Sequence, residues 1–324
     1  MEQILKVLGP SFLTLKEFGF AYGMQGILLC RNFEKMWFEH CITKSKYNIF
    51  YLPSNTINSN VKNLIDIGLN NVPFGIANID NVKNIWNKSI NLEKNVQHRI
   101  AKITTVYESD DAIGSVKDLF YKKQRERKSW WRQISENPSI YHIREGEQKR
   151  GEEHIEIEAQ FPFGNIVVEK IHFKKNASAI LPGISKTSNL RIVEHITSLD
   201  WACLTILCDG YIEIEGSKEL QIHPQLSPYK AYCKANISPE DDDIVKEDLN
   251  DLTLYVIELL REKGVESVIM NNVKKPEVFR VPYIITVNNE SLKSGLVKLV
   301  CQRTLCGETV HITDMAQRMY NLCV

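Results

Sequence analysis

The sequence predicts an α+β domain, built on an antiparallel sheet with flanking helices, followed by a C-terminal α/β domain with a mixed sheet. Hydrophobic residues make up 43% of the 324 positions, enough for one large core or two ordinary ones. Short strand-like and helix-like segments alternate up to about residue 216, although periodicity by itself leaves their topology open. A compositional break at Gly216-Ser217-Lys218 follows. We therefore expect two domains, residues 1–216 and 217–324.

The second domain shows the more regular alternation of strand and helix patterns. Strands are expected over 230–237, 265–270, 281–287, 296–302 and 309–312. Between the first two, residues 243–263 carry apolar side chains at helical spacing. The acidic run Asp241-Asp242-Asp243 suits the start of this helix, and Gly264 stands where its C-terminal cap belongs. A last helix is expected from about Thr313, so helices alternate with strands as in a mixed α/β sheet.

The charge balance leaves nucleic-acid binding open, and the apolar runs argue against a membrane protein. Forty basic residues balance forty acidic ones, so attraction to a nucleic acid has to come from local patches. No apolar run approaches the roughly 20 residues of a membrane span, and a membrane protein is not expected. The first twenty residues also lack the Arg-rich, acid-poor composition of a transit peptide.

The eight cysteines favour reduced thiols in a non-secretory compartment, because they form no short-spaced disulfide framework. Cys301, Cys306, His311 and Cys323 could be imagined as a zinc set. Their spacing matches no compact zinc knuckle, so core positions in strands and a helix are favoured. The segment Leu181–Lys186 lacks the glycines of a phosphate-binding loop. No metal or cofactor is expected.

The segment 122–132 joins a run of cations to the pair Trp130-Trp131. One interpretation is a solvated helix whose tryptophans enter the core. The other is a helix that packs through its indoles while its cations face an anionic partner. At least one of the two indoles is expected in the core.

Motifs spread over nearly the whole chain resemble one family in the right order. The segment 122–132 with Asn137-Pro138-Ser139 resembles the "Arg-x-x-x-x-Trp-Trp-Arg-Lys … Ser-Pro-Ser" segment of accessory subunits of the mitochondrial DNA polymerase, which are non-catalytic relatives of glycyl-type class II aminoacyl-tRNA synthetases. Residues 22–26 with 31, 32 and 37, then 72–79, 161–164, 222–230 and 289–297, resemble further motifs of these proteins. The resemblance implies a class II synthetase-like core and an anticodon-binding-like C-terminal domain.

The same resemblance implies that the chain has no catalytic residues. Class II synthetases hold the ATP phosphates with an Arg on the motif 2 strand and another in motif 3, since developing charge must meet fixed cations. This chain has Asn84 and Trp201 at those positions. Lys83 is adjacent to Asn84 but is expected on the other face of its strand. A neutral indole cannot bind a phosphate.

The resemblance further implies an accessory subunit that raises the processivity and DNA affinity of the catalytic subunit of the polymerase, in the mitochondrial matrix nucleoid. The expected polymerase-binding residues are Leu292, Gly295, Leu296, Lys298 and Gln302. Gly295 is the expected test position, because a turn glycine often holds a positive φ; Gly295→Glu is expected to weaken stimulation with little change in melting temperature. The expected contacts to primer-template or double-stranded DNA are Lys122, Lys123, Arg125, Arg127, Lys128 and Arg132.

Vertebrate members of this family carry a long helical insertion that builds their homodimer. Only about 20 residues, Tyr51 to Asn71, fill the corresponding gap here, too few for two helices and their turns. A monomer that pairs one-to-one with the catalytic subunit is therefore expected. Two alternatives stay open at this point: a free-standing RNA- or tRNA-binding protein, and an active glycyl-type synthetase.

Overall fold

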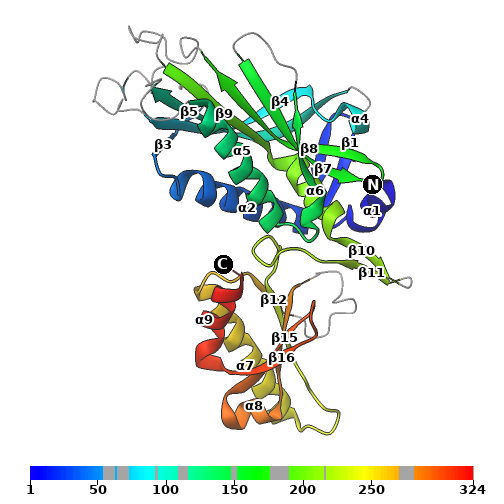
Figure 1. Ribbon diagram of the computed structural model, residues 1–324. Helices are drawn as coiled ribbons and strands as arrows, with labels where there is room; N and C mark the ends of the chain where they lie inside the picture. The colour runs from blue at the N-terminus through cyan, green and yellow to red at the C-terminus, as the bar shows by residue number, and fades with distance from the viewer. Residues whose placement is uncertain are drawn as a thin grey trace. The chain divides into compact units, whose positions relative to one another are not determined.

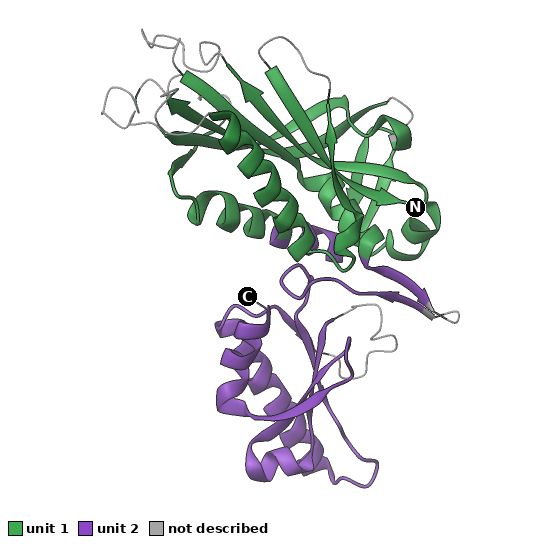
Figure 2. Cartoon of the chain, in the orientation of Figure 1, with its two compact units in different colours: residues 1–23, 33–209 green, residues 24–32, 210–324 purple. Residues whose placement is uncertain are grey.

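The computed structural model describes residues 1–53, 63, 73–91, 94–108, 116–146, 152–175, 190–214, 217–269 and 281–323. The chain forms two compact units (Figure 2). Unit 1 comprises residues 1–23 and 33–209, and unit 2 comprises residues 24–32 and 210–324. In the part of the chain that the structure describes, no helix is both long and apolar enough to cross a membrane.

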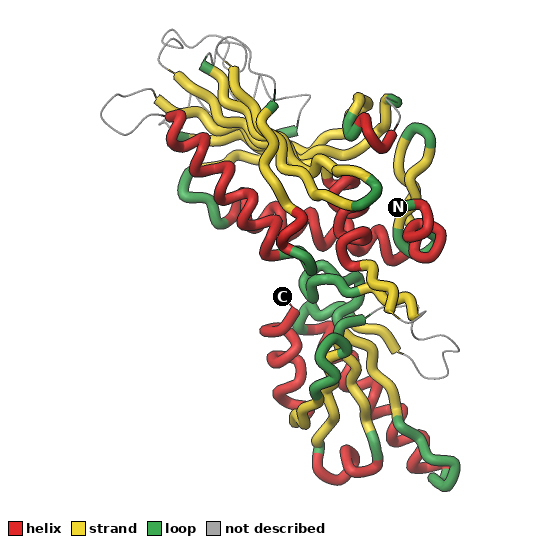
Figure 3. The backbone as a smooth tube through the Cα atoms, turned by 45° about the vertical axis from the view of Figure 1, so that its right-hand side comes forward, coloured by secondary structure: helices red, strands yellow, loops and turns green. Residues whose placement is uncertain are grey.

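Unit 1 is built on a seven-stranded sheet, which the tube in Figure 3 shows as a twisted fan of long strands. The strands lie in the order β3-β4-β5-β9-β8-β7-β6, and every neighbouring pair is antiparallel except the parallel pair β3 and β4. Their bounds are Asn48–Tyr51 (β3), Phe74–Ile85 (β4), Asn95–Glu108 (β5), Tyr141–Glu145 (β6), Glu152–Phe161 (β7), Gly164–Lys174 (β8) and Leu190–Ser198 (β9). The expectation of an antiparallel sheet with flanking helices is confirmed.

The last part of α2 (Met24–Phe38), from Phe33 on, and the helix α5 (Val116–Gln133) lie side by side against this sheet (Figure 1). Phe33 of α2 packs on Trp130 and Trp131 of α5, with ring centroids 5.8 and 5.5 Å apart. Both indoles are buried, which confirms that the tryptophan pair enters the core. Burial of such large aromatic surfaces is the main force holding α5 in place.

The remaining elements of unit 1 are short, apart from α6 (Leu199–Gly210), which follows β9 directly. The others are α1 (Glu2–Leu8), β1 (Leu13–Lys16), β2 (Gly19–Tyr22), the π-turn η1 (Glu39–Thr43), α4 (Lys88–Asn91) and the 3₁₀ turn η3 (Pro138–Ile140). Strands β1 and β2 pair with each other as a hairpin. Backbone hydrogen bonding from Gln97 to Phe18 ties this hairpin to the start of β5.

Unit 2 contains a five-stranded mixed sheet in the order β13-β12-β14-β15-β16, together with a separate hairpin of β10 and β11. β12 pairs in parallel with β13 and β14, and the other neighbours are antiparallel. The bounds are Tyr211–Ile214 (β10), Ser217–Leu220 (β11), Ala231–Ala235 (β12), Ser267–Ile269 (β13), Tyr283–Val287 (β14), Leu296–Cys301 (β15) and Gly307–His311 (β16). This mixed sheet confirms the fold class expected for the C-terminal domain.

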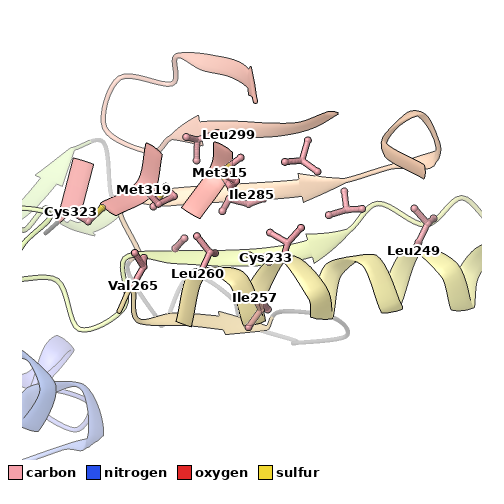
Figure 4. Packing of buried hydrophobic residues seen from close by; sticks show 14 residues of the cluster. Cys233, Leu249, Ile257, Leu260, Val265, Ile285, Leu299, Met315, Met319 and Cys323 are labelled. Atoms are coloured by element: carbon pink, nitrogen blue, oxygen red, sulfur yellow. The ribbon is translucent and has the colours of Figure 1, made fainter. Parts of the chain in front are cut away.

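Helices α7 (Asp243–Glu262) and α9 (Ile312–Cys323) cover one face of the mixed sheet, and a short α8 (Asn289–Ser294) precedes β15. Figure 4 shows the core between them, where Ile257 and Leu260 of α7 and Met315 and Met319 of α9 meet alternate side chains of the strands. Such alternation follows from the two-residue period of a strand.

Local capping sets the ends of α7 as the sequence predicts. The Asp242 carboxylate accepts a hydrogen bond from the Val245 amide at 2.8 Å, so the acidic run caps the helix without any ligand. Gly264 follows the last turn with φ of 79°, a left-handed conformation that glycine adopts without steric penalty. The helix α8 was not expected, because six residues show too little periodicity to signal one.

Candidate functional site

The residues expected to contact a polymerase lie on one part of unit 2. Leu292 is on α8, Leu296 and Lys298 are on β15, and Gln302 is in the turn that follows. All four side chains are exposed. Leu296 and Lys298 alternate with the buried Val297 and Leu299, so they point away from the face that α7 and α9 cover.

This outer face of the sheet is mixed apolar and basic rather than uniformly charged. Ile284 and Thr286 of β14 are directly opposite Val300 and Lys298 of β15, and by the pleat they share the outer face. Leu292 and Leu296 are 37% and 40% exposed. Exposed leucines next to a lysine are a composition that a protein partner can cover, because the apolar area contributes on burial and the cation can pair at the rim.

Gly295 has a structural role in this region. It ends α8 in the left-handed conformation, with φ of 69°, as expected for a turn glycine. A Cβ atom added there would lie 2.5 Å from Nε2 of His311. The backbone conformation disfavours any larger residue, whereas the close contact is with the far end of the His311 side chain, which can move aside. The left-handed backbone at Gly295 argues against the expectation that Gly295→Glu would leave the melting temperature nearly unchanged.

Helix α5 separates its cations between two faces. At 100° per residue, Lys122, Arg125, Lys128 and Arg132 fall within one third of the helix circumference. Lys122, Arg125 and Arg132 are exposed and Lys128 is half-buried. Arg132 donates from Nε to the carbonyl of Pro138 at 2.9 Å.

Within the described residues, Lys122, Arg125 and Lys128 make no ion pair. Lys123, beside this face, pairs with Glu126 at 3.2 Å. An exposed pair of this kind is weak, and Lys123 can exchange its partner readily. The exposed face of α5, defined here by Lys122, Arg125, Lys128 and Arg132, thus presents four cations to solvent.

Arg127 lies on the opposite, buried face, and the expectation that it contacts DNA is wrong. Its side chain is 0% exposed. Its guanidinium donates to both carboxylate oxygens of Glu169 on β8, at 2.8 and 2.9 Å, and stacks 4.2 Å from the ring centroid of Trp130. A guanidinium buried in this way has to remain with its carboxylate, because an unpaired buried charge is strongly unfavourable.

Two further ring nitrogens lie near the carboxylate of Glu169. Trp131 Nε1 donates to it at 2.7 Å, and Nδ1 of His195 lies 3.3 Å from Oε1. Burial by itself would raise the pKa of Glu169, but the charge of Arg127, together with hydrogen bonding from His195 and Arg127, holds it well below its ordinary value. We call Arg127, Trp131, Glu169 and His195 the buried ion cluster; it joins α5 to β8 and β9.

The two positions at which a synthetase needs phosphate-binding arginines lie close together in unit 1. Asn84, near the end of β4, is hydrogen-bonded through Oδ1 to Nε2 of His98 at 2.9 Å. Trp201 in the first turn of α6 is fully buried, with Phe20 packed edge-on at 5.1 Å between ring centroids. Lys83 is exposed on the other face of β4, with Nζ 5.6 Å from the Phe18 ring, as expected from strand alternation.

A cavity of about 230 Å³ lies beside these residues, in unit 1. Tyr22 and the backbone amide of Arg99 both donate to the carboxylate of Asp200, the latter at 2.6 Å. The Arg99 guanidinium is 3.2 Å from Glu34 and 3.6 Å from Asp200. The cavity is lined by Gly19, Phe20, Tyr22, Asn81, Gln97, His98, Arg99 and Asp200.

The charges around this cavity are matched within the protein. Burial lowers the pKa of His98 to about 4, so its imidazole is neutral at neutral pH. The positive charge of Arg99 already faces two carboxylates. The guanidinium beside the cavity is therefore already paired within the protein.

Sequence reasoning missed the buried ion cluster and the Tyr22–Asp200–Arg99 group. One signal for the first was available, because Glu169 directly follows the apolar run Ile166-Val167-Val168 and a carboxylate there needs a buried cation. No local pattern indicated which cation, since Arg127 and Glu169 are 42 residues apart. The segment 181–186 and most of the gap 51–71 lie outside the described residues.

Comparisons with known proteins place the chain next to one kind of relative. No protein-family model matches it. It is 25% identical over 228 residues to DNA polymerase subunit gamma-2, mitochondrial, of Drosophila melanogaster, covering 63% of this chain and 62% of that protein. It is 22% identical over 279 residues to the protein of the same name from Xenopus laevis, covering 75% and 58%. The chain thus matches about three fifths of the length of each relative.

A solved structure shows the same fold. Prolyl-tRNA synthetase from Cryptosporidium parvum, determined with L-proline and AMP, superposes with a TM-score of 0.66 over 99% of this chain and 77% of the other, at 11% identity. The chain therefore has a class II aminoacyl-tRNA synthetase fold. It is also related in sequence to proteins named as a polymerase subunit.

Proposed function

We infer that this homologue of mitochondrial DNA polymerase subunit gamma-2, built on a class II synthetase fold, is a non-catalytic accessory subunit of a mitochondrial DNA polymerase. The observation that carries the proposal is the sequence match to two such subunits, over 63% and 75% of the chain. The chain also has a synthetase fold, with Asn84 and Trp201 in place of phosphate-binding arginines. By the names of its relatives, the proposed location is mitochondrial, in the matrix nucleoid.

The interior of unit 1 supports a role without aminoacyl transfer. Adenylate formation requires fixed cations at the α- and γ-phosphates, worth several kcal/mol in the transition state. The neighbourhood of those positions instead offers an amide, an indole and an imidazole kept neutral by burial. The unit is proposed to serve as a scaffold that carries α5 and other surfaces.

The outer face of the mixed sheet in unit 2, with Leu292, Leu296, Lys298 and Gln302, is the proposed docking surface for the catalytic subunit. Its exposed leucines supply apolar area, and Lys298 supplies charge at the rim. Gly295 supports this surface by ending α8, and it is not itself proposed as a contact.

The exposed face of α5 is the proposed contact to primer-template DNA. None of its four cations has a carboxylate partner among the described residues, so phosphates can replace water and counterions around them. A DNA contact from this face, in addition to those of the catalytic subunit, would lower the rate at which the complex leaves DNA and so raise processivity. Lys123 is a weaker candidate because Glu126 already faces it.

Reconstitution with the catalytic subunit tests the proposal. We expect a complex that dissociates from primer-template more slowly and synthesises longer products per binding event than the catalytic subunit by itself. ATP–pyrophosphate exchange should stay at the level of a heat-killed control. Exchange above that level would mean an active synthetase. Tight tRNA binding with no effect on the polymerase would instead indicate an RNA-binding protein.

A further inference from the structure

Two thiols face each other across the tip of the β15–β16 hairpin in unit 2. The ladder between the strands ends with Val300 opposite Gly307, which makes Cys301 and Cys306 the next opposed pair. The Cys301 amide donates to the Cys306 carbonyl at 3.0 Å, so the two backbones are held together at this point. Both cysteines are free thiols.

This placement suits a disulfide. Opposed residues of an antiparallel pair put their side chains on the same face, with Cα atoms about 5.5 Å apart when they are hydrogen-bonded. Disulfides bridge Cα separations of roughly 4.4–6.8 Å. The four residues between the cysteines form a tight loop, in which the Leu305 amide donates to the Cys301 carbonyl at 2.9 Å. The loop closes no large ring, so little chain entropy opposes the bond.

The two thiols are also accessible, unlike most of the others. Cys306 is exposed and Cys301 is half-buried, whereas Cys30, Cys203, Cys208, Cys233 and Cys323 are buried. The sequence-based expectation that cysteines in this region occupy core positions therefore holds for Cys323 but is wrong for Cys306.

The loop surrounds the Cys301 sulfur with groups that favour the thiolate. Burial by itself would raise the pKa of Cys301, but hydrogen bonds from the Thr304 side chain and from the amides of Thr304 and Arg303 lower it, and the charge of Arg303 adds to them. On its other side Cys301 approaches Tyr283 and Cys323, whose pKa values burial raises to about 12, so both stay neutral. Across the sheet edge Arg318 and Glu308 neutralise each other as an ion pair.

We propose that Cys301 and Cys306 form a redox-active thiol pair, which low-molecular-weight disulfides convert to a disulfide across the hairpin tip. Cys301 reacts first, because the thiolate is the nucleophile in disulfide exchange. Its sulfur attacks a sulfur of glutathione disulfide, so an S–S bond to the protein forms, the S–S bond of the reagent breaks, and one glutathione thiolate leaves.

The second step closes the pair. The Cys306 sulfur, as thiolate after losing its proton to solvent, attacks the Cys301 sulfur of the mixed disulfide and releases the second glutathione thiolate. The protein is oxidised by two electrons, and glutathione disulfide is reduced to two thiols. Exposure of Cys306 at the loop end leaves it able to reach the mixed disulfide without unfolding of the sheet.

Peptide mapping of the whole protein after incubation with glutathione disulfide tests this assignment. Trypsin cuts after Lys298, Arg303 and Arg318, so a Cys301–Cys306 bond joins peptides 299–303 and 304–318. A bond from Cys301 to the buried Cys323 would instead join peptides 299–303 and 319–324. We expect the first linked pair as the main product, with a mass lower than the sum of the reduced peptides by two hydrogen atoms.

Matched variants make the result decisive. Cys306→Ser should abolish the link and leave glutathione attached at Cys301, whereas Cys323→Ser should leave the link unchanged. Thr304→Val should slow alkylation of Cys301 several-fold, because it removes a hydrogen bond to the thiolate. The proposal fails if Cys301 and Cys306 stay separately modified in the unaltered protein, or if the link to 319–324 predominates.

Discussion

His98 is a buried imidazole with a partner at each ring nitrogen. Nδ1 lies 2.9 Å from Oγ of Ser198 and Nε2 lies 2.9 Å from Oδ1 of Asn84. Burial lowers the pKa of His98 from 6.5 to about 4, and Asp200 opposes this shift only in part. The imidazole beside Asn84 is therefore neutral at neutral pH, and it links β4 and β5 to the end of β9.

The pH dependence of folding should report this imidazole. Its folded pKa of about 4 is below its unfolded value of 6.5, so its contribution is fully present above pH 6.5 and is lost as the pH falls toward 4. We expect the free energy of unfolding to decrease over that range, and the decrease to be smaller in His98→Asn. NMR titration of the His98 ring measures the pKa directly. A value at or above 6.5 would contradict the burial argument.

Arg127 is the residue whose position changes the interpretation of the basic helix most. Arg127→Met should destabilise the protein by about 3–5 kcal/mol, because it leaves Glu169 charged and unpaired in the core. The double variant Arg127→Met/Glu169→Leu should recover much of this loss, since no buried charge remains. Chemical denaturation measures both effects.

Lys122→Met in the same helix is the matched control, because its side chain is exposed, and it should leave stability nearly unchanged. Equal effects of the substitutions at positions 122 and 127 would contradict the importance of the buried ion cluster.

At the scale of an element, α5 divides into a scaffold face and a face available to DNA. Lys122→Gln/Arg125→Gln/Lys128→Gln should preserve folding and weaken DNA binding by the reconstituted pair, because fewer counterions are released. The slope of log affinity against log salt should become shallower by up to about 2.7, if all three cations contact phosphates. Affinity measured over a salt series gives this slope.

Lys6→Gln/Lys16→Gln/Lys88→Gln is the control for that test, because it removes the same charge from exposed sites of unit 1. It should change the slope little. If both triple variants behave alike, only net charge matters, and α5 is scaffold alone.

The segment from α8 through β15 is the element-scale candidate for polymerase docking. Leu292→Glu/Leu296→Glu should weaken the complex at least tenfold, because two exposed apolar side chains would become charges at the interface. The melting temperature should be unchanged, since neither residue is in the core. Binding can be measured by titrating the variant into the catalytic subunit.

A matched variant on α7 controls for added charge in the same unit. Ile244→Glu/Leu254→Glu alters side chains that are 72% and 43% exposed, and it should bind normally. If the two double variants weaken binding to the catalytic subunit equally, the proposed docking surface is wrong.

At the scale of the whole molecule, the expected state is a monomer that joins one catalytic subunit. The reason is the short gap between positions 51 and 71, most of which the structure does not describe. Sedimentation at micromolar concentration should give the mass of a single 37.3 kDa chain, and the mixture should give a one-to-one complex. A stable homodimer would show that the interface does not need the long insertion.

The sequence by itself determined the class of the fold and most of the elements of the C-terminal mixed sheet. Hydrophobic periodicity predicts the strands and the helix of unit 2 to within a few residues, since the two periods follow from backbone geometry. Helix caps such as Asp242 and Gly264 depend only on neighbouring residues, so they can be predicted from the sequence. The departures at Asn84 and Trp201 likewise needed only alignment to known motifs.

Tertiary structure decided which of the polar residues are available to a partner. In sequence Arg127 looks like its neighbours Arg125 and Lys128, but a carboxylate 42 residues away makes it part of the core. The positive φ of Gly295, by contrast, is a local feature of the turn that ends α8. Burial and charge pairing join residues distant in the chain, so no local pattern encodes them; they arise only once the sheet has brought those residues into contact.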